Sequence, residues 1–163
     1  MFQLIPHGWL GWNFDVFEGD HQVAEIKTST LPESGTFAID GVSYRAYREG
    51  MFSGDFFLES DGQTIASAEK PSAFLNSFNI THIDRSYALK KESFVSRSFI
   101  LLEGDREVGS IRSEGLLTRK ATAALPEMMP RPVQLFVVWL AILLWRREAN
   151  AGAAAAASAA AST

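Results

Sequence analysis

The chain of 163 residues contains no cysteine, which excludes disulfides, a thiol nucleophile and thiolate metal sites. Its three histidines, His7, His21 and His82, lie in three separate segments. A metal site would need them to converge through the tertiary fold alone, so loop or strand-end histidines are the simpler interpretation. The motifs GxGxxG, GxxxxGK[ST], GxSxG and HExxH are also missing, and the chemistry that each supports has no basis in this sequence.

Carboxylates are the remaining candidates for catalysis. Four of them gather around one predicted hairpin: Asp55, Glu59, Asp61 and Glu69. Paired carboxylates can perform acid–base chemistry, but solvent-facing positions on a strand explain the same residues more simply. The sequence therefore predicts a non-enzymatic protein with no cofactor and no metal.

The chain also lacks an excess of basic residues. Its net charge is -4 and its pI is about 5.4, which argues against a general nucleic-acid binder. The charge is uneven, because residues 1–81 carry -7 and residues 82–163 carry +3, so a basic face is expected in the second half. The first residues have neither the basic region nor the continuous apolar region of a signal peptide, and we expect a cytoplasmic protein.

Long hydrophobic runs are rare, and one stands out. Pro132 to Trp145 contains eleven unbroken apolar residues, Leu135 to Trp145, which would cover every side of a helix. The eleven residues would reach roughly 16 Å and the whole stretch about 21 Å, well short of the roughly 30 Å hydrocarbon core of a bilayer. A helix over about 132–147, buried in protein, is therefore predicted. The alternative is a membrane anchor, with aromatic and basic residues at the interface: Arg131, Trp139, Trp145, Arg146 and Arg147.

A weak internal repeat runs through the first 115 residues. Phe17–Ile26 aligns without gaps to Leu102–Ile111, and Leu58–Ala68 is a third copy with one extra residue. Each copy predicts a strand, a Gly/Asp turn and a returning strand. Thr36–Arg45 and Ser77–Lys90 have the same pattern, which makes five hairpins and ten strands. The amino-terminal segment and Thr118–Leu125 could each add one strand.

About twelve strands and one helix that is apolar all round suit each other. A barrel of about eight strands is filled by its own side chains, whereas one of about eleven can hold a central helix. The predicted fold is mainly β: an antiparallel closed barrel of about twelve strands enclosing a hydrophobic C-terminal helix, over residues 1–147. Arg146 and Arg147 would end the helix, where cations complement its dipole. Residues 148–163, mostly alanine, are expected to be a disordered or fraying tail.

The order of these features resembles the tubby C-terminal-like superfamily, and within it the LURP-one-related proteins, which share a group with phospholipid scramblases. Two pieces carry the resemblance: Val108-Gly109-Ser110-Ile111-Arg112, similar to a recurrent strand of the group, and the apolar helix. The resemblance implies a twelve-stranded barrel around a hydrophobic helix and no particular reaction. It also implies a link to phosphoinositide binding or lipid movement for some members, and no binding residue follows from it.

One constellation of basic residues suggests a function. It comprises Lys90, Lys91, Arg97, Arg112, Arg119 and Lys120. On a shared face they would suit phosphate or anionic phospholipid headgroups, and a salt-bridged barrel exterior is the alternative. The predicted function is a binding module for anionic lipid or another phosphate-bearing ligand, in peripheral contact with a membrane. Two alternatives stay open: a protein-interaction domain with Phe52, Phe56 and Phe57 outside the barrel, and a tail-anchored membrane protein.

Overall fold

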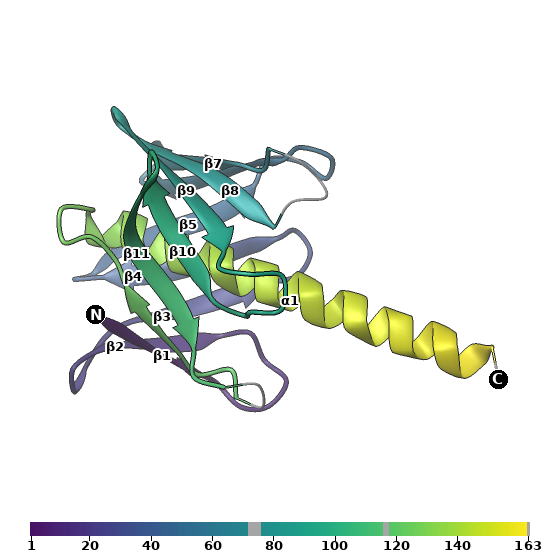
Figure 1. The fold of residues 1–163 in the computed structure, drawn as a ribbon. Helices are drawn as coiled ribbons and strands as arrows, with labels where there is room; N and C mark the ends of the chain where they lie inside the picture. Colours follow the sequence, from purple (N-terminus) through teal and green to yellow (C-terminus); the bar gives the residue numbers. More distant parts are fainter. Residues whose placement is uncertain (72–75, 116–117, 163) are drawn as a thin grey trace.

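The computed structural model describes residues 1–71, 76–115 and 118–162. Twelve antiparallel strands form a closed barrel, and a single long helix runs through it (Figure 1). The strands are β1 (Phe2–Pro6), β2 (Phe14–Glu18), β3 (His21–Ser29), β4 (Ser34–Ile39), β5 (Val42–Arg48), β6 (Asp55–Ser60), β7 (Gln63–Glu69), β8 (Ser77–His82), β9 (Arg85–Lys91), β10 (Phe99–Glu103), β11 (Arg106–Ser113) and β12 (Ala121–Ala124). The helix is α1 (Arg131–Ala161).

Each strand pairs with its neighbours in sequence, and β1 closes the ring by pairing with both β2 and β12. Closure leaves no free edge among the described strands, which removes the usual route to edge-to-edge aggregation. The predicted mainly-β barrel is thus confirmed, as are the five hairpins. The Asp40-Gly41 and Asp61-Gly62 turns have positive φ at both residues, as the favoured two-residue hairpin turn requires.

The repeat has a structural counterpart. The hairpins β2–β3, β6–β7 and β10–β11 each shift register at the same point, directly after Val16, Leu58 and Leu101. These residues are 42 and 43 positions apart, so all three copies align without the extra residue that the sequence suggested. Bulges of this kind bend a strand and increase its twist, and three of them at regular intervals help the sheet to close.

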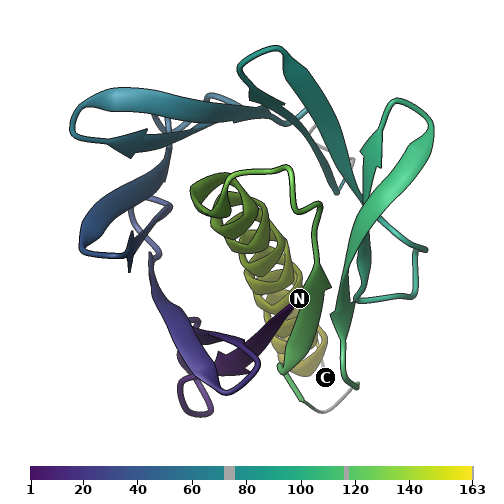
Figure 2. The ribbon, with the colours of Figure 1, turned by 90° about the vertical axis from the view of Figure 1, so that its left-hand side faces the viewer.

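The core lies between the inner wall of the barrel and α1. Figure 2 looks along the barrel from the end where α1 begins and shows the helix inside the ring of strands. All residues of α1 from Val133 to Arg146 are buried. Trp139 packs against Phe56 and Phe136, with 6.0 Å between ring centroids in each pair. A Cβ atom at Gly35 on β4 would lie 2.3 Å from Trp139 Nε1, so glycine is what lets the indole reach the wall.

The sequence predicted that the helix ends near residue 147. This prediction is wrong, because α1 continues through the alanine-rich segment to Ala161. Residues 149–162 are exposed, and the extension projects beyond the barrel (Figure 1). Nucleation is the costly step of helix formation, and the buried turns have already provided it. Alanine, the strongest helix former, then extends the helix one residue at a time without packing.

Candidate interaction surface

The two ends of the barrel differ, because connections between antiparallel strands alternate between them. At the end where α1 begins, here the turn end, the connections are 19–20, 40–41, 61–62, 83–84, 104–105 and 125–130. At the end from which α1 leaves, here the exit end, they are 7–13, 30–33, 49–54, 70–76, 92–98 and 114–120. Five of the six exit-end loops have six or seven residues, whereas five of the six turn-end connections have two.

Large exposed hydrophobic residues gather at the exit end. The described residues include eleven such side chains, and seven of them lie in four exit-end loops. We call these seven the loop crown: Trp9, Leu10, Leu31, Met51, Phe52, Phe94 and Val95. Trp9, Phe52 and Phe94 are 94%, 96% and 101% exposed, so each ring stands almost wholly in solvent. Apolar side chains in this number on one end of a protein indicate an interaction surface.

The two ends of the barrel also differ in charge. Each of the six turn-end connections holds one acidic residue and no lysine or arginine: Asp20, Asp40, Asp61, Asp84, Asp105 and Glu127. The exit-end loops hold four acidic and four basic residues. Arg146, Arg147 and Glu148 of α1 add a further positive charge there. The turn end is therefore acidic, and the exit end is apolar with a slight positive charge.

Four consecutive residues of α1 bind the rim of the barrel where the helix leaves, and we call them the collar. Trp145 Nε1 donates to the Arg97 carbonyl at 2.7 Å, and Arg146 donates to the Ser29 carbonyl at 2.9 Å. Arg147 makes two bonds to the Glu33 carboxylate, at 2.6 and 2.9 Å, and Glu148 pairs with Lys91 at 2.8 Å. Arg146 and Arg147 thus fix the helix laterally and do not mark its end.

Glu33 is the centre of charge in this region. Burial opposes its ionisation, but the hydrogen bond from Arg147 and the charges of nearby guanidinium groups outweigh burial and hold the pKa of Glu33 below its ordinary value of 4.5. Arg48 and Arg146 also lie near the carboxylate, at 3.5 and 3.9 Å. Glu33 therefore stays ionised and ties its own loop and the end of β5 to the helix.

Two of the six basic residues predicted as a patch are paired with carboxylates. Lys91 pairs with Glu148, and Arg112 pairs with Glu92 at 2.8 Å. For these two residues the contacts are those of the salt-bridged exterior that the sequence offered as the alternative. Lys90 and Lys120 are exposed at separate places, on β9 and on the loop before β12.

Arg97 and Arg119 are the two members that the structure brings together. They line a groove of about 520 Å³ at the exit end, beside Trp9, Trp12 and Trp145. The Arg119 guanidinium donates to the carbonyls of Gly8, Trp9 and Gly11 and lies 5.1 Å from the Trp12 ring centroid. Its principal role is to hold the loop that presents Trp9 and Leu10.

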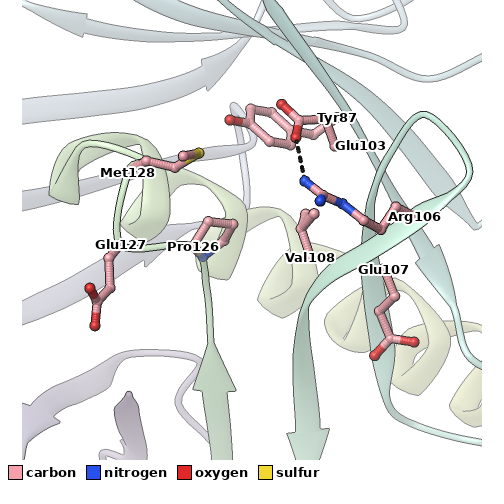
Figure 3. Close-up of a pocket in the computed structure, with 8 residues that line it drawn as sticks. All are labelled: Tyr87, Glu103, Arg106, Glu107, Val108, Pro126, Glu127 and Met128. Atoms are coloured by element: carbon pink, nitrogen blue, oxygen red, sulfur yellow. Dashed lines mark ion pairs between the residues drawn. The ribbon is translucent and has the colours of Figure 1, made fainter.

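A second pocket, of about 480 Å³, lies at the turn end (Figure 3). Glu103 is paired there with Arg106 at 3.5 Å and with Arg85 at 3.1 Å. The other two carboxylates of the lining, Glu107 and Glu127, point away from this group (Figure 3). The pocket thus presents a neutralised carboxylate and not a facing pair suited to acid–base chemistry.

Of the predicted carboxylates, the structure places Asp55 directly opposite Glu69, as register partners on β6 and β7. Glu59 accepts a hydrogen bond from Tyr47 at 2.7 Å, Asp55 accepts one from Ser53, and Asp61 lies in a turn at the opposite end from Asp55. His7 lies 2.5 Å from Asp15, and His82 Nδ1 lies 2.8 Å from the Ile65 carbonyl. Among the described residues, no group of three histidine or acidic side chains could hold a metal ion.

The three phenylalanines that the sequence suggested as a protein-interaction surface have different environments in the structure. Phe56 is 1% exposed in the core, whereas Phe52 is at the tip of its loop. Phe57 is partly buried and packs against Tyr47, with 6.0 Å between their ring centroids. Phe52 therefore belongs to the loop crown, and Phe57 lies on the outer face of the barrel, where it is partly exposed.

The other six residues of the loop crown were not predicted from the sequence. A signal was present, because apolar pairs such as Trp9-Leu10, Met51-Phe52 and Phe94-Val95 interrupt polar or glycine-containing connections. The pairs fall in alternate connections between predicted strands, which in an antiparallel barrel lie at one end. Grouping the predicted connections by the end of the barrel at which they lie would have predicted that these pairs share one end.

Comparison of the chain with protein-family models, with curated proteins and with solved structures finds no match in any of the three. The resemblance to tubby-like barrels therefore stays a prediction. No helix in the described parts of the chain combines the length and apolar content needed to cross a membrane.

Proposed function

We propose that the protein is a non-enzymatic binding module that docks on an anionic lipid surface through the loop crown. The observation that carries the proposal is the coincidence of two gradients. Seven of the eleven exposed large hydrophobic side chains among the described residues lie at the exit end, and the turn-end connections carry acidic residues without a lysine or arginine. An anionic surface repels the turn end and accepts the exit end, so both gradients favour one orientation.

The form of the crown supports a lipid surface as the partner. Its members stand on four separate loops around the mouth of the barrel. Side chains on separate loop tips can enter a deformable interface together, and tryptophan suits the headgroup region. Complete burial of a large apolar side chain contributes about 1.5–3 kcal/mol, and a basic residue near an anionic membrane about 1 kcal/mol. The apolar contribution is therefore the larger one.

The projecting part of α1 is compatible with this orientation, which directs it toward the lipid. Residues 149–162 contain no charged side chain. The hydroxyl groups of Ser158 and Ser162 donate to carbonyls of their own helix, at 3.0 and 2.9 Å. These two serines can approach hydrocarbon without leaving their hydroxyl groups unpaired.

Co-sedimentation with vesicles tests the proposal. The wild-type protein is expected to pellet with phosphatidylcholine vesicles that contain phosphatidylserine, and less with pure phosphatidylcholine. The triple variant Trp9→Ser, Phe52→Ser, Phe94→Ser should lose at least about tenfold in partitioning, since tenfold corresponds to only about 1.4 kcal/mol. All three side chains are exposed, so the variant should unfold at the temperature of the wild type.

Ile83→Ser is the matched control, because Ile83 is 82% exposed at the turn end. It should pellet like the wild type. Equal loss in both variants would show nonspecific hydrophobic adsorption and contradict the proposal. Absence of wild-type binding to either vesicle would also overturn it and would favour a protein partner for the crown.

A further inference from the structure

A group of cations surrounds a single carboxylate beside the crown. Arg48, Lys70, Arg146 and Arg147 all act on Glu33, whose pKa reflects the three arginines. Arg147 binds the carboxylate directly, at 2.6 Å, and Arg48 and Arg146 lie 3.5 and 3.9 Å from it. Three of these cations, Arg48, Lys70 and Arg147, line one groove together with Glu33.

The pKa of Lys70 also reflects the positive charges around it. Desolvation lowers the pKa of its ammonium group, and the positive charges of Arg147 and Arg48 lower it further, against the opposing charge of Glu33. An anion placed here would relieve this mutual repulsion. The energy of its binding would come in part from that relief.

The cations open into a groove of about 470 Å³ at the exit end, which we call the cationic groove. Its lining comprises Glu33, Arg48, Phe52, Gly54, Phe56, Lys70, Pro71 and Arg147. Two of its guanidinium groups, those of Arg48 and Arg147, lie over the Phe56 ring, at 6.0 and 5.6 Å from its centroid. Stacking on a buried ring fixes both groups, and planar guanidinium groups suit the oxygen atoms of a phosphate.

A second groove adjoins the first. It has a volume of about 630 Å³ and shares Glu33, Arg48 and Phe52 with the cationic groove. Its remaining lining is mainly apolar and includes two crown residues, Leu31 and Met51. A cationic hollow continuous with an apolar one fits an amphiphile with a phosphate at one end and a hydrocarbon chain at the other.

We infer that the cationic groove binds the phosphate group of a single anionic phospholipid, whose acyl chain lies along Leu31, Met51 and Phe52. The inference rests on the proposed docking of the crown and gives that surface a specific ligand. It assigns phosphate recognition to residues from β5, the loop after β7 and α1. The basic residues that the sequence singled out lie on later strands and loops.

Binding of water-soluble short-chain lipids tests the groove without a membrane. Dihexanoylphosphatidic acid, used below its critical micelle concentration, is expected to bind the wild-type protein in a calorimetric titration. Inorganic phosphate should bind more weakly at the same site, because it lacks the chains, and should compete with the lipid. Dihexanoylphosphatidylcholine, whose headgroup is zwitterionic, should bind more weakly than the acid.

Lys70→Gln and Arg48→Gln should each weaken binding of the acid at least tenfold. Lys70→Gln retains the bonds between Glu33 and Arg147, which guards against loss of folding, and a thermal melt verifies this. Lys120→Gln is the matched control, an exposed cation of the same end outside the groove, and should leave the affinity unchanged.

Three results would overturn the inference. These are no wild-type binding of either the short-chain acid or phosphate, equal affinity in the Lys70→Gln variant, and equal loss in the Lys120→Gln control. If phosphate binds as tightly as the short-chain acid, the proposed contact of the acyl chain with the apolar groove is wrong. Vesicle binding that persists when the short-chain acid does not bind would refute the groove and leave the proposed function intact.

Discussion

Deleting residues 131–163 is expected to abolish folding of the barrel. The deletion removes every buried residue of α1 and leaves the inner wall facing an empty interior. Gross burial of the eleven apolar residues from Leu135 to Trp145 is on the order of 20 kcal/mol, whereas the net stability of a domain is about 5–15 kcal/mol. Circular dichroism should show no cooperative thermal transition for the truncated chain.

A shorter deletion serves as the control. Removing residues 149–163 takes away the exposed extension and keeps the collar, so this chain should melt close to the wild-type temperature. A cooperatively folded chain of residues 1–130 would contradict the assignment of α1 as the core. It would revive the tail-anchored alternative, in which the helix is dispensable for folding.

Gly35→Ala should destabilise the protein by at least about 3 kcal/mol, at the upper end of the usual cost of overpacking. The new methyl group would lie 2.3 Å from Trp139 Nε1 and 2.4 Å from Trp139 Cδ1, so wall and helix cannot keep their positions. Chemical denaturation gives the loss in free energy of unfolding. Trp139→Phe in the same chain should restore part of it, which a double-mutant cycle would show as coupling.

Gly152→Ala provides the comparison. A Cβ atom there meets nothing within 4 Å, and the residue lies in the exposed part of the helix. Its free energy of unfolding should stay the same or rise slightly, since alanine favours helix over glycine. Equal losses at the two glycines would mean that the approach of Trp139 to β4 does not govern stability.

Local chemistry made much of the fold predictable. The Asp-Gly and Gly-Asp pairs specify tight turns, and the alternation around them specifies strands. Eleven consecutive apolar residues specify a helix buried on all sides. Strand number and helix diameter then leave few ways to combine them, which is why the barrel followed from the sequence.

The end of the helix was harder to predict because its cause is not local. Alanine alone gives a marginal helix in water, and the buried turns that nucleate it depend on the whole barrel. Arg146 and Arg147 illustrate the same limit. Their sequence position suggested a helix terminus, whereas their contacts are with Ser29 and Glu33, from the opposite part of the chain.

The candidate site was the least predictable feature. The partners of the basic residues decide whether they can receive a ligand, and those partners lie far away in sequence, as in the pair of Lys91 and Glu148. The cationic groove likewise joins Arg48, Lys70 and Arg147 from three distant segments. Composition favoured a basic second half, but Arg48 and Lys70 belong to the acidic first half.

The orientation of the protein on a membrane is a direct test of docking through the loop crown. The chain has no cysteine, so a single nitroxide label can be placed at Phe94→Cys in the crown or at Ile83→Cys at the turn end. With vesicles that contain phosphatidylserine, the label at 94 should become protected from a water-soluble relaxation agent and accessible to oxygen, while the label at 83 should not change. Protection at 83, or no change at 94 in protein that is bound, would contradict docking through the loop crown.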